Sequence, residues 1–170
     1  MEEESIEVKF MEAELIKILE KMYKKRLLSK GIRQIEDYER MNLKIREYNN
    51  YECIVPLSKV LVDGTQCASA TEEVVETIAI LVENHKRLAI HEVLKASSDI
   101  AKNGKSWLNM LYRMMFLKQE NVQTFKEEYQ GFDEEVKNNV ADFLKYQLEN
   151  NYISLEIFEE ILGTRQYIVS

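Results

Sequence analysis

The stretch Trp107–Leu117, WLNMLYRMMFL, decides the fold of this chain, because it is apolar at every position except Asn109 and Arg113. A helix that is apolar around most of its circumference must be covered by other elements, since exposure would drive aggregation. The run is shorter than the roughly 20 apolar residues of a membrane-spanning helix. We therefore expect it to form the central helix of a core, with Leu111 and Met114 almost fully buried.

The composition of the whole chain predicts one helical domain. The sequence has 170 residues, of which 45% are hydrophobic and 31% are charged, as in ordinary globular proteins. A chain of this length buries roughly two thirds of the surface of its unfolded form, so it needs no metal ion or disulfide for stability. Glycine and proline are scarce, and β-rich proteins use both residues in turns. The expected fold is all-α, a single domain over residues 1–170.

The spacing of apolar residues predicts the helices before the central one. Apolar positions three and four apart indicate a first helix over Ser5–Leu28 and a second that runs to Tyr48. Tyr51–Val55 is expected to be extended, because Pro56 disfavours the α conformation in the residue before it. A short helix then follows over residues 56–63.

Capping residues predict the remaining boundaries. We expect N-caps at Ser69, Asn121, Asp133 and Ser154, and a kink within the helix that crosses residues 84–87. These segments give about eight helices, arranged as a single-domain bundle around the central apolar helix. A short superhelix of stacked helical hairpins is the second arrangement that the pattern allows.

The charge and the cysteines indicate an intracellular, cytoplasmic protein. The net charge of -7 opposes nonspecific binding to nucleic acid or to an anionic membrane, although a local patch can override this average. Cys53 and Cys67 have no nearby His or Cys that would complete a metal site, so both are expected to be free thiols in a reducing compartment. The acidic N-terminus lacks the pattern of a secretory signal, and no segment is expected to span a membrane.

The sequence identifies no catalytic, cofactor-binding or metal-binding residue. Gly104–Ser106 resembles the end of a phosphate-binding loop, but Asp99 occupies the position of that loop's first glycine. His85 and His91 would point roughly 120° apart on one helix, so they cannot chelate one metal ion and are expected on the surface. No cofactor is expected.

The densest run of positive charge extends from residue 21 to residue 33 and contains no acidic residue. It is a candidate patch for nucleic acid, phospholipid or an acidic partner segment. Cations also gather at helix C-termini because the helix dipole favours them there. This structural explanation of the basic run is the favoured one. The side chains concerned are Lys21, Lys24, Lys25, Arg26, Lys30 and Arg33, of which Lys21 and Lys24 are expected to be exposed together.

Methionines within the central run suggest an adaptable apolar surface. Trp107, Met110, Met114 and Met115 resemble the floors of grooves that accept partner helices, although packing in a core explains the same residues and is the favoured interpretation.

The function expected from these features is a non-enzymatic protein-interaction module or adaptor. Such a protein binds another protein or a second copy of itself through helical surfaces. The alternative is a nucleic-acid-associated protein that uses residues 21–33, which requires those side chains to converge on one surface. A further alternative is an enzyme whose site is assembled from distant residues.

Overall fold

The structure, a computed structural model, describes residues 2–163, and for residues 2–12 it describes the helical backbone. Residues 1 and 164–170 of the expected domain lie outside this range. The all-α class is confirmed, since every regular element in the described range is a helix. These elements are α1 (Glu2–Lys24), α2 (Ile32–Tyr48), the 3-10 helix η1 (Tyr51–Cys53), α3 (Ile54–Ser58), α4 (Ala68–His85), α5 (Arg87–Asn103), α6 (Lys105–Met115), α7 (Gln119–Gln130), α8 (Glu134–Glu149) and α9 (Leu155–Leu162).

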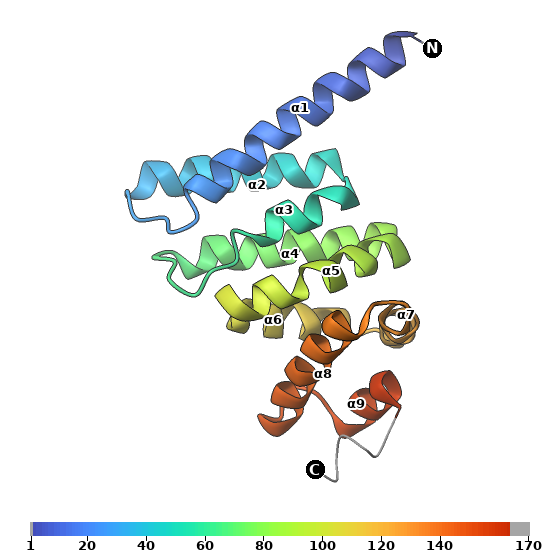
Figure 1. Cartoon of the computed structure of the whole chain (residues 1–170). Helices are drawn as coiled ribbons and strands as arrows, with labels where there is room; N and C mark the ends of the chain where they lie inside the picture. The colour runs from blue at the N-terminus through green and yellow to red at the C-terminus, as the bar shows by residue number, and fades with distance from the viewer. Residues whose placement is uncertain (1, 164–170) are drawn as a thin grey trace.

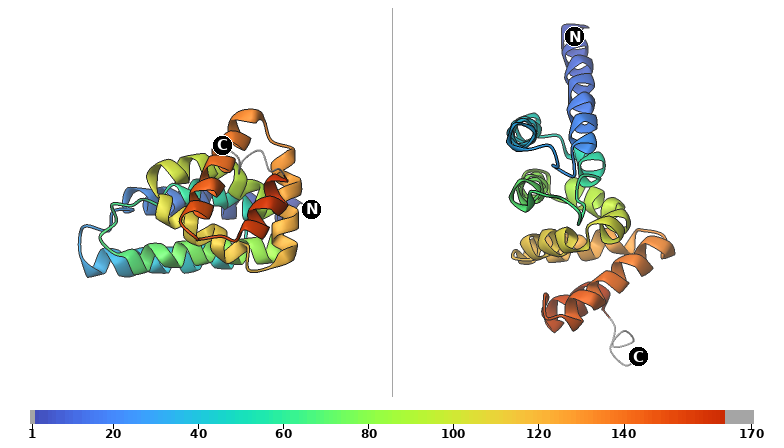
Figure 2. Two further views of the ribbon diagram at one scale, coloured as in Figure 1. Left: turned by 90° about the horizontal axis from the view of Figure 1, so that it is seen from below. Right: turned by 90° about the vertical axis from the view of Figure 1, so that its left-hand side faces the viewer.

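The helices pack in two rows. One row contains α1, α3, α5, α7 and α9, each packed on the next, and the other contains α2, α4 and α6. Figure 1 shows the rows running from α1 at one end of the molecule to α9 at the other, and the right-hand view of Figure 2 separates them. This layout is consistent with a helical bundle, and the order within the rows is that of stacked helical hairpins.

α1 lies at the end of its row and is only partly covered. Leu15, Leu19 and Met22, in its C-terminal half, are buried against the helices that follow. The N-terminal half of the helix rises beyond the other helices, as Figures 1 and 2 show. One end of α1 is therefore anchored in the fold while the backbone of the other end projects from it.

The core near α6 is built from aromatic rings. The ring of Tyr112 meets those of Phe125 and Phe143 edge-on, with centroids 5.2 and 5.3 Å away. The hydroxyl of Tyr112 lies 2.6 Å from Ser97 Oγ. Because Ser97 donates its own proton to the carbonyl of Val93, Tyr112 is the donor to Ser97. This bond satisfies a polar group that would otherwise be costly to bury.

The prediction for the central helix is correct on one face and wrong on the other. Leu111 is fully buried, as expected, but Met114 is only half-buried and Leu117 is 84% exposed. α6 packs against α4 and α5, and Phe143 and Gln147 of α8 also contact it, but Met110 and Met114 lie on a side that these helices leave partly open. This partly open side, which carries Met110 and Met114, is the uncovered face of α6.

The expected extended stretch Tyr51–Val55 is wrong, because this stretch is helical. The side chain of Asn50 accepts a hydrogen bond from the backbone N–H of Glu52, at 2.9 Å, and starts the turn. Pro56 is the third residue of α3, where a backbone N–H has no partner inside the helix. Its missing N–H therefore costs nothing, and packing overrides the preference of the preceding residue.

Two of the four expected N-caps are confirmed. Asp133 accepts from the N–H of Val136 at 2.9 Å, and Ser154 accepts from that of Ile157 at 3.2 Å. The other two expected caps are wrong. Ser69 lies inside α4, which starts without a side-chain cap, and Asn121 lies inside α7 and donates to the carbonyl of Met115.

The expected kink at residues 84–87 is a complete break between α4 and α5. Lys86 has a φ of 54°, in the left-handed region, so the helical hydrogen bonding stops there. Near the N-terminus, α1 ends at Lys24 rather than at Leu28, because residues 25–27 form a turn. The expected helix over residues 56–63 is also shorter, since α3 ends at Ser58.

Candidate functional site

The uncovered face of α6 forms one wall of a groove, and α9 with the loop before it forms the other. The groove has a volume of about 500 Å³. Its apolar lining residues are Met110, Met114, Phe116, Leu117, Ile153 and Ile157, and its polar ones are Ser106, Asn109, Arg113, Tyr152 and Ser154.

Helix packing and two hydrogen bonds hold the walls of this groove. Gln147 of α8 donates to Asn109 of α6 at 2.9 Å, which connects the two helices beside the groove. The cap from Ser154 fixes the start of α9, and α9 packs on α7 and α8. The groove is thus formed by α6 and α9 together with the short connections that follow α6 and precede α9.

Two apolar side chains of the groove are exposed to solvent. Leu117 is 84% exposed and Tyr152 is 38% exposed, and both line the groove. The guanidinium of Arg113 lies 5.7 Å from the centroid of the Tyr152 ring. Arg113 forms no ion pair with any described residue. The groove therefore combines an apolar floor with one cation that lacks a carboxylate.

The four residues that the sequence suggests for a groove floor lie in two different places in the structure. Met110 and Met114 line the groove, but Trp107 and Met115 are buried in the core. Trp107 also donates from Nε1 to the carbonyl of Val62, at 2.9 Å. The contribution of α9, including Ile157, has no signal in the sequence, because it depends on which distant helix packs beside α6.

The basic residues from Lys21 to Arg33 do not all line one groove either. Lys24, Lys25 and Lys30 line one groove of about 450 Å³ at the connection between α1 and α2, together with Asp37. Lys21 and Lys24 are exposed, as predicted, and Lys30 and Arg33 are exposed too.

Arg26 lies apart from these lysines. Its Nη1 donates to the carbonyl of Tyr23 at 2.9 Å, and its guanidinium lies 4.2 Å from the centroid of the Tyr23 ring. Among the described side chains, none of the basic residues from Lys21 to Arg33 forms an ion pair. Their charge is therefore not neutralised within the described part of the fold.

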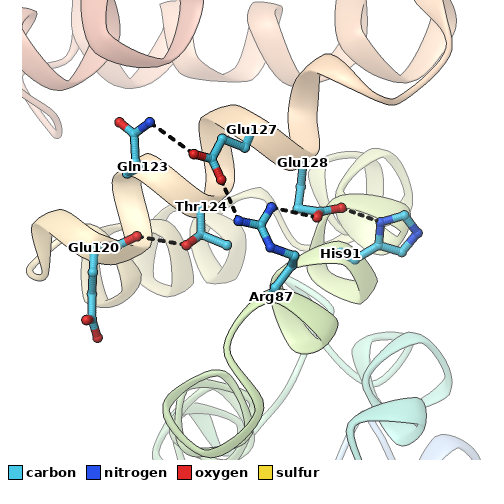
Figure 3. Close-up of polar contacts among 7 residues, drawn as sticks. All are labelled: Arg87, His91, Glu120, Gln123, Thr124, Glu127 and Glu128. Carbon is cyan, nitrogen blue, oxygen red and sulfur yellow. Dashed lines mark hydrogen bonds and ion pairs between the residues drawn. The ribbon is translucent and has the colours of Figure 1, made fainter.

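A third cluster of polar side chains connects α5 to α7 (Figure 3). Arg87 lies between two carboxylates of α7, with an ion pair to Glu127 and another to Glu128 at 2.9 Å. His91 Nδ1 lies 2.9 Å from the second oxygen of Glu128, and its ring stacks on Phe132. The hydrogen bond from Arg87 holds the pKa of Glu127 below its usual range. Because these groups are paired with one another, the cluster acts as a cross-link between two helices.

The other residues singled out by the sequence make separate contacts. His85 Nε2 lies 2.8 Å from the carbonyl of Asn49, at a different interface from His91. Lys105 Nζ lies 3.6 Å from the centroid of the Tyr146 ring, while Ser106 donates to Asp63 at 3.0 Å. Gly104–Ser106 thus joins two helices, and its polar side chains are engaged in different directions.

Among the side chains that the structure describes within residues 2–163, no three from His, Cys, Asp or Glu are placed to hold a metal ion. In the same range, no helix has the length and apolar character needed to cross a bilayer. Comparison of the chain with protein-family models, with curated proteins and with solved structures finds no match.

Proposed function

We propose that this protein is an intracellular interaction module that binds an amphipathic helix of a partner protein in the groove between α6 and α9. The observation that carries the proposal is the uncovered face of α6 and the turn after it, where Met110, Met114 and Leu117 lie in one groove with the unpaired cation of Arg113. Exposed apolar patches of this kind, rimmed by polar residues, are typical of protein-interaction sites. Both cysteines are free thiols, which is compatible with an intracellular location.

The spacing of the lining residues favours a helical partner. Met110 and Met114 lie one helical turn apart on α6, and Leu117 follows in the turn after this helix, so the three side chains form a short apolar strip. A partner helix lying along this strip would contribute apolar residues at the same spacing. Methionine side chains adapt to differently shaped partners because they are unbranched and flexible. Arg113 would select a partner with a carboxylate beside its apolar residues.

The test uses a displayed library of amphipathic helical peptides selected on the full chain. We expect enriched peptides to carry apolar residues at helical spacing and at least one acidic residue. Met114→Glu should weaken their binding by about tenfold or more, because it places a carboxylate on the apolar floor. Met114 is only half-buried, so this variant should fold, and its melting temperature checks that it does.

Ile80→Glu is the matched control for this experiment. Ile80 lies on α4, is 39% exposed and does not line the groove, so its replacement should leave peptide binding unchanged. Failure to enrich any peptide would contradict the proposal. Enriched peptides that bind Met114→Glu as tightly as the original protein would contradict it too.

A second candidate function is the binding of nucleic acid at the groove lined by Lys24, Lys25 and Lys30. The convergence of three unpaired lysines favours it, whereas Asp37 in the same groove and the net charge of -7 oppose it. In a gel-shift assay with single- and double-stranded oligonucleotides at low salt, we expect no complex. Lys24→Glu with Lys25→Glu should change the free energy of unfolding by well under about 1 kcal/mol. A salt-sensitive complex that this double variant loses would instead identify the protein as a nucleic-acid binder.

A further inference from the structure

α1 exposes a second apolar surface on the side that does not face the core. Ile16 and Tyr23 lie about two turns apart on this helix and are 55% and 43% exposed. Together with Leu19 and with Pro56 of α3, they line a groove of about 440 Å³. Because Leu19 and Met22 already anchor α1 in the core, this groove is free to bind something else.

The groove carries positive charge at the end nearest the C-terminus of α1. Lys24 and Lys59 line it, and Arg26 and Lys59 line the adjoining groove, which shares Tyr23. None of these three cations forms an ion pair with a described residue. The carboxylates that face the same surface are Glu20, Glu52 and Asp99. A segment that binds in this groove should therefore be apolar along its length and acidic where it contacts Lys24 and Lys59.

The first half of α1 has this chemistry in its sequence. Residues 2–14, EEESIEVKFMEAE, contain six glutamates, one lysine and four large apolar residues. The second half of the same helix is basic, with Lys17, Lys21 and Lys24. The backbone of the first half projects beyond the other helices, so a second molecule can approach it (Figures 1 and 2).

We propose that two copies of this chain form a two-fold dimer in which the α1 helices lie antiparallel, each in the groove between the other copy's α1 and α3. Antiparallel pairing places the acidic half of each α1 beside the basic half of its partner, and two-fold symmetry makes both contacts at once. With the symmetry axis at Ala13, Glu2 is level with Lys24 of the second copy and Phe10 is level with Ile16.

The length of the helix is sufficient for this contact. Residues 2–12 span about 16 Å of helix, and the distance along α1 from Ile16 to Lys24 is about 12 Å. The projecting half can therefore cover the whole groove. This dimer uses the end of the molecule opposite to the groove between α6 and α9, so it does not depend on the function proposed above.

The test is sedimentation velocity of the full chain over a concentration series at low and high salt. We expect a dimer at low salt that dissociates as salt rises, because the proposed charge pairs are exposed to solvent. Ile16→Glu should raise the dissociation constant by about tenfold or more. Leu43→Glu is the matched control, since Leu43 is 52% exposed, lies on α2 and lines neither groove.

Charge reversal tests the antiparallel arrangement itself. Lys24→Glu with Lys59→Glu should weaken the dimer, and so should Glu2→Lys with Glu3→Lys and Glu4→Lys. A chain that carries both sets of changes should regain the dimer, because the charges are again opposite. A protein that stays monomeric under all conditions would overturn the proposal. So would a dimer that is indifferent to Ile16→Glu, or a combined variant that does not recover.

Discussion

Gly104→Ala is expected to destabilise the protein by about 3 kcal/mol, although it adds only one methyl group. A Cβ atom at this position would lie 2.1 Å from the carbonyl oxygen of Leu61 and 2.7 Å from its carbon. Both are backbone atoms, and hydrogen bonds on either side prevent this part of the chain from moving away. The N–H of Asp63 donates to the carbonyl of Asn103 at 3.0 Å, and Trp107 donates to that of Val62 at 2.9 Å. Urea unfolding of the variant would measure the loss.

Gly131→Ala is the matched control for this substitution. A Cβ at Gly131 would meet its nearest neighbour, the carbonyl oxygen of Glu128, at an ordinary 3.5 Å, and the residue has a φ of -84°. Alanine can adopt this conformation, so we expect a gain of about 0.5 kcal/mol from the reduced entropy of the unfolded chain. Similar effects of the two substitutions would contradict the close approach of Leu61 to the junction of α5 and α6.

Leu111→Ala should cost about 2 to 5 kcal/mol, because it leaves a cavity where α6 packs on its neighbours. Leu111 is fully buried and belongs to the same core as Tyr112 and Phe125. The melting temperature and the urea midpoint should both fall. Leu117→Ala, six residues later in the same apolar run, should change stability by less than about 0.5 kcal/mol, since Leu117 is 84% exposed. Equal losses at the two positions would show that Leu117 is covered as completely as Leu111.

The parts of the fold that depend on neighbouring residues in the sequence could be predicted. The all-α class follows from apolar spacing and from the scarcity of turn-forming residues, and the caps at Asp133 and Ser154 follow from side chains that bond N–H groups three residues away. Near Pro56, the local preference for extended backbone gave the wrong result, because packing of the short α3 helix outweighs it.

The parts that depend on distant contacts could not be predicted. Met114 and Leu111 lie in the same apolar run, and the packing of distant helices beside α6 determines that Leu111 is buried and that Met114 faces a groove. Likewise, nothing in the order of residues places Ile157 beside Met110, or Lys59 beside Lys24. The sequence could suggest methionines for a binding surface, but not the second wall that makes the surface a groove.

The two-row packing also determines how events at the two ends of the molecule are coupled. α1 packs on α2 and α3, whereas α9 packs on α7 and α8 at the far end (Figure 1). In proteins built from stacked helices, each helix interacts mainly with its nearest neighbours. Free-energy changes caused at distant sites are therefore additive. Occupancy of one end should therefore leave the affinity of the other end unchanged. One molecule could then hold a second copy and a partner helix at the same time, without cooperativity between them.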